Sequence, residues 1–193
     1  MVKTVLPLLV AVAVALGAGA GSVWMMIEEA PAIDALRVGP WTAFPNAGTP
    51  QADPYSRARF VREGGIPLGK AEGIAFTATH DTDGRALRRE CAYRLSGELP
   101  VSRFWTLYAA DPTGVPLPPT GRRAPALHSQ RILQAPEGIE ITASPYPAPG
   151  NWLALSGEGS MQLVLTLFDT PVSTSAGIEQ ISMPGILRTG CGA

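Results

Sequence analysis

The sequence predicts an all-β protein: an antiparallel β-sandwich of jelly-roll type with one short helix, preceded by an N-terminal transmembrane helix. Three features indicate this fold class. The first 27 residues contain a long apolar run. Glycine and proline, 21 and 19 of the 193 residues, recur along the whole chain, which is typical of short strands joined by turns. Between the turns, apolar and polar residues alternate with the period of a strand.

The N-terminal run is long enough to cross a bilayer as a helix. No charged residue occurs from Val5 to Ile27, a stretch longer than the roughly 20 residues that a spanning helix needs. Lys3 precedes the run, and Glu28 and Glu29 follow it. The positive-inside rule then places the N-terminus in the cytoplasm. We expect a single-pass membrane protein, anchored through residues 5–27, with its domain outside the cytoplasm.

A cleaved signal peptide is the alternative reading of this segment. Residues 18–20, Ala-Gly-Ala, fit a cleavage site, and cleavage would release the domain from the membrane. The apolar run continues to Ile27, which favours a retained anchor, and Trp24 suits an interfacial position. The expected boundaries are an anchor over 1–27, a linker with a first strand near Leu36–Trp41 over 28–52, and the sandwich domain over 53–193.

One helix is predicted at the start of the domain. Asp53 can cap it, Pro54 suits the first helical position, and the Gly64-Gly65 pair ends it. Arginines and a glutamate keep most of its surface in water, and the apolar face is expected to be Tyr55, Ala58 and Val61.

The remainder of the domain alternates as strands do. Both faces of the stretch RFWTLYA are apolar, which predicts a central strand covered on both sides. IEQISM is expected to be the last strand. Three further predicted strands each have an apolar face, and GIEITAS is a fourth strand. The apolar faces are formed by Ile74, Phe76 and Ala78 in the first, by Cys91, Tyr93 and Leu95 in the second, and by Met161, Leu163, Leu165 and Leu167 in the third.

Two motifs that suggest ligands do not meet the requirements of their chemistry. GGIPLGKA approaches a phosphate-binding loop, but Ala71 stands where a hydroxyl would hold Mg²⁺, and Pro67 lacks a backbone N–H. Residues 80–84, His-Asp-Thr-Asp-Gly, lack the later ligands of a calcium loop and fit a hairpin turn. With two histidines and two cysteines in the chain, we expect no metal and no cofactor. The net charge of −1 argues against nucleic acid as a partner.

The order of several motifs carries a family resemblance. The motifs ADPYSRA, GGIPLGKAEGIAFTATHDTDGRAL, CAYRLSG, RFWTLYAAD, GNWL and LVLTLFDTP follow one another along the chain. In this order the sequence resembles the family known as domain of unknown function 1214, in its stand-alone, membrane-anchored bacterial form, over residues 36–193. Ala154 departs from the Asn-Trp-Leu-Pro turn of that family. The resemblance implies a β-sandwich, often found beside a second domain of unknown function (1254), and no established activity. Because the resembling form is bacterial, it also implies an anchor in the bacterial inner membrane with the domain in the periplasm, or a domain secreted to the periplasm if the segment is cleaved.

These features favour a non-catalytic module of the cell envelope that binds a glycan, a lipid-linked molecule or a partner protein of the DUF1254 type. The alternative is a hydrolase of envelope glycans or amides, which would need two carboxylates flanking one bond. Trp152 follows a turn, where its ring can stack on a sugar or close the end of the core, and we favour the second role. The candidate site residues are Trp152, Trp41, Asp169, Asp111 and Glu72.

The two cysteines, Cys91 and Cys191, are expected to form a disulfide. Both follow the apolar run and so lie on the side of the membrane where disulfides persist. An even number of cysteines in an exported domain favours pairing, and the family resemblance is consistent with it. The bond would tie the last residues of the chain to the sandwich.

Overall fold

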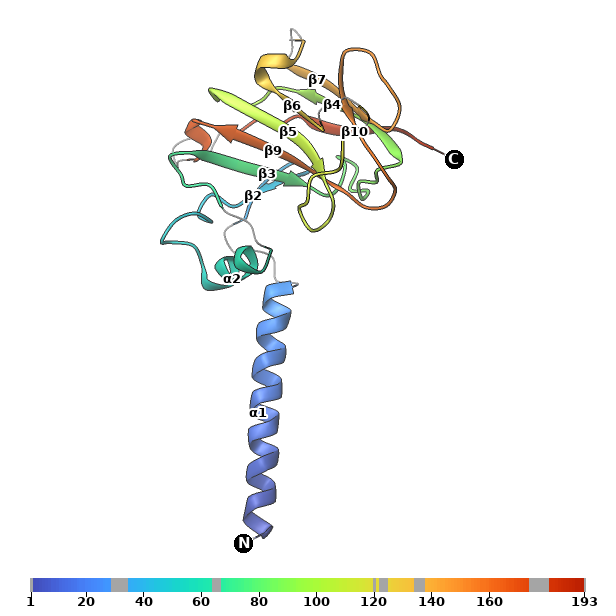
Figure 1. Ribbon diagram of the computed structural model, residues 1–193. Helices are drawn as coiled ribbons and strands as arrows, with labels where there is room; N and C mark the ends of the chain where they lie inside the picture. Colours follow the sequence, from blue (N-terminus) through green and yellow to red (C-terminus); the bar gives the residue numbers. More distant parts are fainter. Residues whose placement is uncertain are drawn as a thin grey trace.

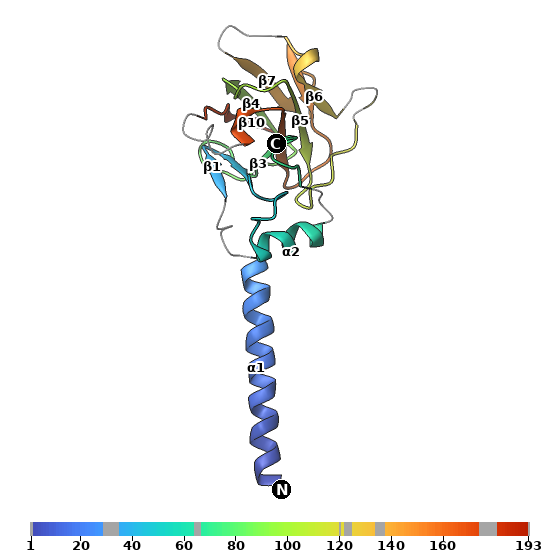
Figure 2. The same cartoon turned by 90° about the vertical axis from the view of Figure 1, so that its left-hand side faces the viewer.

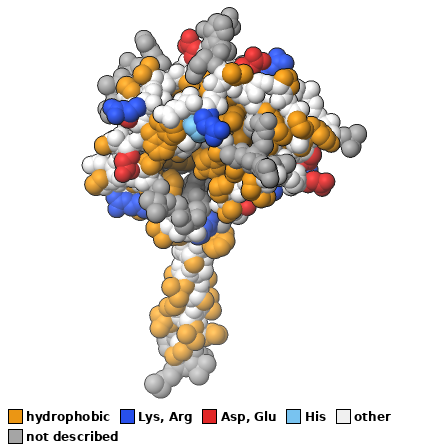
Figure 3. Space-filling view, turned by 45° about the horizontal axis from the view of Figure 1, so that its top comes forward, with side chains coloured by type: hydrophobic (Ala, Val, Ile, Leu, Met, Phe, Trp, Pro, Cys, Tyr) orange, Lys and Arg blue, Asp and Glu red, His pale blue; other side chains and the backbone are white. Residues whose placement is uncertain are grey.

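The computed structural model describes residues 2–28, 35–63, 67–119, 121, 125–133, 138–173 and 181–192. Helix α1 (Val2–Glu28) forms a single rod that projects away from a β-rich domain (Figure 1). Its segment Val5–Met25 is long and apolar enough to cross a membrane, with a mean hydropathy of 2.1. Hydrophobic side chains cover much of the described part of this rod (Figure 3). The predicted membrane-spanning helix is therefore present as a helix of suitable length and composition.

The domain is a sandwich of two β-sheets, as predicted. All neighbouring strands are antiparallel except β7 and β8, which run parallel. The six-stranded sheet has the order β1 (Leu36–Val38), β2 (Trp41–Ala43), β3 (Gly73–Ala78), β9 (Gln162–Phe168), β5 (Phe104–Ala110) and β6 (Ala126–His128). The four-stranded sheet has the order β10 (Gly185–Cys191), β4 (Cys91–Gly97), β7 (Ile139–Ser144) and β8 (Asn151–Ala154). The described residues also include the short 3₁₀ helices η1 (Ser129–Arg131) and η2 (Pro171–Ser173).

A single apolar core lies between the two sheets. The alternation read from the sequence places the predicted residues in it, because side chains two apart on a strand share a face. The inward side chains of the six-stranded sheet, including Phe76, Leu107 and Leu165, are almost fully buried, as are Tyr93 and Ile141 of the other sheet. Trp105, on the strand expected to be covered on both sides, is 6% exposed.

The chain enters and leaves the sandwich differently from the sequence prediction. The first strand is two strands, β1 and β2, joined by a tight turn at Gly39 (φ +56°), a conformation that favours glycine. Trp41 on β2 is wholly buried, so part of the expected linker belongs to the sheet. The last strand is β10 rather than IEQISM. Residues 178–180 of that stretch lie outside the described residues, and 181–183 form no strand. β10 forms a strand although it contains two glycines, which disfavour strands, because it pairs with β4 along most of its length.

Helix α2 (Pro54–Glu63) begins where the sequence predicts, but a different face of the helix packs on the domain. The Asp53 carboxylate accepts the N–H groups of Tyr55 and Ser56 at 2.9 and 3.1 Å, which caps the helix. The Gly64-Gly65 pair expected to end it lies outside the described residues. Ser56 and Phe60 face the domain, because the Phe60 ring packs edge-on against Phe44 with centroids 6.0 Å apart. The face predicted to be buried is instead exposed: Tyr55, Ala58 and Val61.

Candidate functional site

A pocket of about 350 Å³ lies on the outer face of the six-stranded sheet. Its floor is made by outward-facing side chains of three neighbouring strands, and its opposite wall by α2 and the loop after β2. The turn after β5 and the segment before β3 complete it. The lining residues are Phe44, Pro45, Ala47, Ser56, Phe60, Pro67, Leu68, Gly73, Ile74, Ala75, Thr77, Tyr108, Pro112, Thr113, Gly114, Gln162 and Val164. We call this cavity the neutral pocket.

Strand register brings the floor of the neutral pocket together. Val164 on the central strand β9 lies between Thr77 on β3 and Tyr108 on β5, each directly opposite it. Because side chains opposite each other in an antiparallel sheet point to the same face, these three form one row across the outer face. Tyr108 and Val164 are outward neighbours of inward-facing core residues. The same alternation that builds the core therefore builds the floor.

The turn after β5 forms a fixed wall of the neutral pocket. The Asp111 carboxylate accepts the hydroxyl of Thr113 at 2.6 Å and the backbone N–H groups of Thr113 and Val115 at 2.8 and 3.0 Å. The hydrogen bond from the Thr113 hydroxyl contributes most to holding the pKa of Asp111 below its usual value. Gly114 has φ +89°, where glycine is favoured. Gln162 donates its side-chain N–H to the Asp111 carbonyl at 2.9 Å.

The described lining of this pocket contains no acidic or basic side chain. Its polar groups are hydroxyls and an amide, on Ser56, Thr77, Tyr108, Thr113 and Gln162. Burial raises the pKa of the Tyr108 hydroxyl, so this group stays neutral at physiological pH. Such a lining suits an uncharged and largely apolar ligand, since nothing in it compensates a buried charge.

The acidic residues proposed from the sequence lie outside the lining. Glu72 accepts the backbone N–H of Gly69 at 2.9 Å, and Asp169 forms an ion pair with Arg103 at 2.8 Å. Both adjoin the end of β9 at Phe168, whereas Asp111 adjoins the other end, at Gln162. The six residue steps between these ends span about 20 Å in a strand. Asp111 therefore cannot flank one scissile bond together with either of the others.

The tryptophans proposed as binding residues have their rings inside the protein. Trp41 is fully buried, and its indole N–H donates to the Pro184 carbonyl at 2.8 Å. Trp152 is 8% exposed and donates to the Ser144 carbonyl at 2.9 Å. Trp152 lies opposite Thr142 of β7, on the outer face of the four-stranded sheet and outside the core cluster between the sheets. The two roles considered for it, stacking on a sugar and closing the core, both stay predictions.

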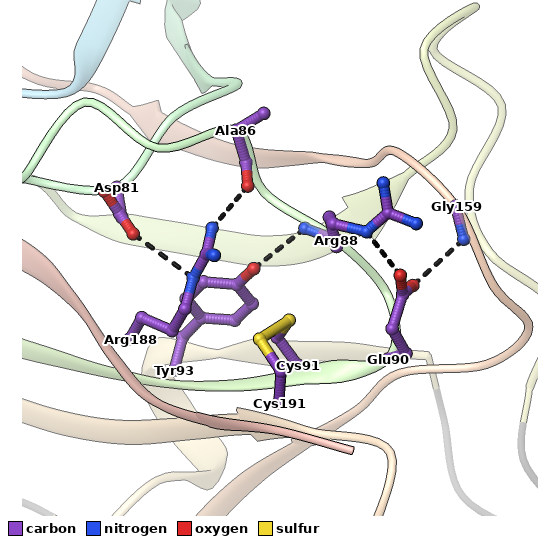
Figure 4. The surroundings of a disulfide bond; sticks show 9 residues. All are labelled: Asp81, Ala86, Arg88, Glu90, Cys91, Tyr93, Gly159, Arg188 and Cys191. Carbon is purple, nitrogen blue, oxygen red and sulfur yellow. Dashed lines mark hydrogen bonds and ion pairs between the residues drawn. A yellow bond between two sulfur atoms is a disulfide. The ribbon is translucent and has the colours of Figure 1, made fainter. Parts of the chain in front are cut away.

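A cluster of charged residues surrounds the disulfide between Cys91 and Cys191 (Figure 4). The two cysteines lie directly opposite each other on β4 and β10, and their sulfurs are 2.04 Å apart. The disulfide inferred from the sequence is thus present. We call the disulfide together with Asp81, Tyr93 and Arg188 the clamp.

The charged groups of the clamp contact other residues of the same chain. Arg188 lies 3.4 Å from the Asp81 carboxylate and stacks over the Tyr93 ring at 5.5 Å. Asp81, 2% exposed, accepts the N–H groups of Asp83 and Arg85 at 3.1 and 2.8 Å. Residues 80–84 thus form a capped turn. Within the described part of the chain, no group of three His, Cys, Asp or Glu residues is placed to hold a metal ion.

Comparisons with known proteins find a family of unknown function and two similar solved structures. The family model described as "Protein of unknown function (DUF1214)" matches residues 72–172, just over half of the chain. A crystal structure of the VPA0106 protein from Vibrio parahaemolyticus is 17% identical, with a TM-score of 0.57, over 72% of this chain and 36% of that one. A putative uncharacterized protein from Burkholderia cenocepacia is 20% identical, with a TM-score of 0.46, over 86% and 39%. The chain thus spans less than two fifths of either solved protein. No curated protein matches it.

The residues of the neutral pocket were not among the site candidates taken from the sequence. Its polar groups are common residue types in ordinary strands and turns, so no motif marks them. One signal was present: both faces of β5 are apolar, which indicates that its outer face is covered as well as its inner one.

Proposed function

The chain belongs to the DUF1214 family, and from the neutral pocket we propose that it is a non-catalytic, membrane-anchored binding module of the cell envelope. The pocket would hold the uncharged, apolar portion of a lipid-linked molecule. The observation that carries this proposal is that the described lining holds no charged side chain around a cavity of about 350 Å³, within the range of small-molecule sites.

Two further features support the cell-envelope location that we propose for the domain. A helix of spanning length precedes the domain, and the domain contains a disulfide. Disulfides persist in the periplasm and are rare in the cytosol, which is consistent with a periplasmic domain on a retained inner-membrane anchor. A partner protein of the DUF1254 type and an envelope glycan remain predictions. The hydrolase alternative gains no support at the pocket, because the candidate carboxylates lie outside its described lining.

Photo-crosslinking tests the proposed ligand class. The full chain would be reconstituted in nanodiscs that contain a phospholipid with a diazirine on its acyl chain. We expect labelled peptides from β3, β5 and β9, in addition to α1. Ala75→Trp would fill the pocket from an exposed position on its floor and should abolish labelling of these strands.

The matched control is Ala86→Trp, which makes the same change at an exposed position outside the pocket lining. This variant should label like the wild type. Labelling confined to α1 in the wild-type protein, or equal loss in both variants, would contradict an acyl-chain site in the pocket. Mass measurement of the membrane-extracted protein tests the anchor separately, since a chain that starts near Gly21 has lost it.

A further inference from the structure

Helix α2 exposes an apolar face on the side opposite to the neutral pocket. Val61 is 81% exposed and Tyr55 is 38% exposed, and Pro54 and Ala58 are exposed as well. Residues three or four apart on a helix lie on one face, so these four form a continuous strip that we call the outer stripe. A surface helix normally turns such a face toward a partner. Here the inner face already packs on the domain through Phe60.

The position of α2 identifies what the outer stripe meets. The helix lies across the outer end of α1 and between that end and the sheets (Figures 1 and 2). The Arg62 guanidinium is 5.9 Å from the centre of the Trp24 ring. Trp24 stands one residue before the end of the apolar span at Met25. Aromatic residues at such ends occupy the headgroup region, so the geometry holds α2 at the same depth.

The charges of α2 fit this depth. Arg57 and Arg62 are both exposed and border the outer stripe. Arginine next to an apolar face with an aromatic residue is typical of helices that lie in the plane of a membrane, where the cations meet anionic phosphates. A protein partner would have to share this space with the bilayer that α1 crosses.

We propose that α2 is an interfacial helix, with the outer stripe inserted at the headgroup boundary of the outer leaflet and its inner face closing the neutral pocket. The occupant of the outer stripe is the bilayer that α1 spans. This inference rests on the retained anchor of the proposed function, but it does not depend on what the pocket binds. It places the pocket directly above the membrane surface.

Fluorescence quenching in nanodiscs tests the position of α2. The full chain carrying Val61→Cys is labelled with an environment-sensitive fluorophore and reconstituted in phosphatidylethanolamine and phosphatidylglycerol. A fraction of the lipid carries a spin label near the headgroup end of its acyl chain. We expect blue-shifted emission and several-fold stronger quenching at position 61 than at a control position. The native cysteines stay in their disulfide and do not react.

The matched control is Leu133→Cys, because Leu133 is also an exposed apolar residue, at 68%. It comes two residues after η1, the short helix that lies at the end of the domain far from α1 (Figure 1). An intact chain with equal, weak quenching at both positions would overturn the interfacial helix alone. A mass lacking the anchor would overturn it together with the membrane anchoring. Pocket crosslinking that fails while position 61 is quenched leaves the interfacial helix standing and rejects only the ligand class.

Discussion

The domain places polar side chains below its surface in two regions, the clamp and the neutral pocket, and uses them in opposite ways. In the clamp, charged groups from distant parts of the chain contact one another. Arg188 donates to the Ala86 carbonyl at 2.5 Å across 102 residues of sequence and pairs with Asp81. In the pocket, the polar groups are neutral and surround about 350 Å³ of space.

This difference separates stability from binding. A buried charge is costly unless it is paired, so the groups of the clamp have little freedom to take a ligand. Neutral hydroxyls and amides around a cavity cost less to leave facing it. The clamp contains charged residues of the kinds found in many active sites, but the cavity that could hold a ligand is in the pocket. Changes in the clamp should therefore alter stability, and changes in the pocket should alter binding.

The largest effect on stability is expected from removal of the disulfide in the double variant Cys91→Ala and Cys191→Ala. The bond joins positions 100 residues apart, for which chain entropy allows about 4.7 kcal/mol and measured effects are about 2–4 kcal/mol. Urea unfolding of the two proteins measures the loss. Pocket labelling of the folded fraction should be unchanged, and a loss of labelling in protein that is still folded would break the separation of the two regions.

The ion pair of the clamp should rank next. Arg188→Met leaves the buried Asp81 carboxylate without its cation and should cost about 3 kcal/mol, near the lower end for a broken buried pair, because the Arg188 side chain is 17% exposed. Adding Asp81→Asn removes the charge but keeps the acceptor for the turn. The double variant should recover part of the loss in a double-mutant cycle. Strictly additive losses would show that the pair contributes nothing through its charge.

Tyr108→Phe in the pocket is expected to change stability less than the clamp variants do, and to weaken binding instead. The ring stays, so the stability should change by less than about 1.5 kcal/mol, the net worth of one hydrogen bond. Binding should weaken by up to about tenfold if the hydroxyl donates to the ligand. Competition against the photoreactive lipid measures this change. Unchanged binding with a clear loss of stability would assign Tyr108 to the structure rather than to the site.

The smallest effect is a pH dependence of the pocket wall. The folded-state pKa of Asp111 is lower than its usual 3.8, first because of the Thr113 hydroxyl. Its contribution is therefore fully present above the usual value and is lost as the pH falls through the folded pKa. Asp111→Asn keeps an oxygen acceptor but cannot titrate. We expect stability measured in urea below pH 3.8 to fall less steeply in this variant than in the wild type. Equal slopes would contradict the role of Asp111.

The core was predictable from the sequence because alternation is a local property. The inward sets on β3, β4 and β9 follow from residue order alone. Which face of α2 packs on the domain was not predictable from the sequence. The helix has two apolar faces, and the choice between them depends on the contact of Phe60 with Phe44, which is distant in sequence. Strand β10 was missed for a similar reason. Its pairing with β4 and its disulfide are long-range, and glycine and arginine hide its alternation.

The candidate site was less predictable than the fold. The carboxylates stood out because they occupy strand ends, where turn caps and catalytic acids look alike in sequence. The row of Thr77, Val164 and Tyr108 requires the pairing of β9 between β3 and β5, which no local pattern specifies. The disulfide was accessible because two cysteines allow one pairing.

The position of β9 and β10 in the two sheets sets the timing of assembly as the chain is synthesised. β9 separates β3 from β5, and β10 completes the edge beside β4, although both strands are made long after their neighbours. A growing chain therefore carries exposed edges and a free Cys91 thiol until residues near 191 have been made. Since such distant pairings close slowly, the domain gains its stability in one late step. Until then its unpaired strand edges are open to association with other chains.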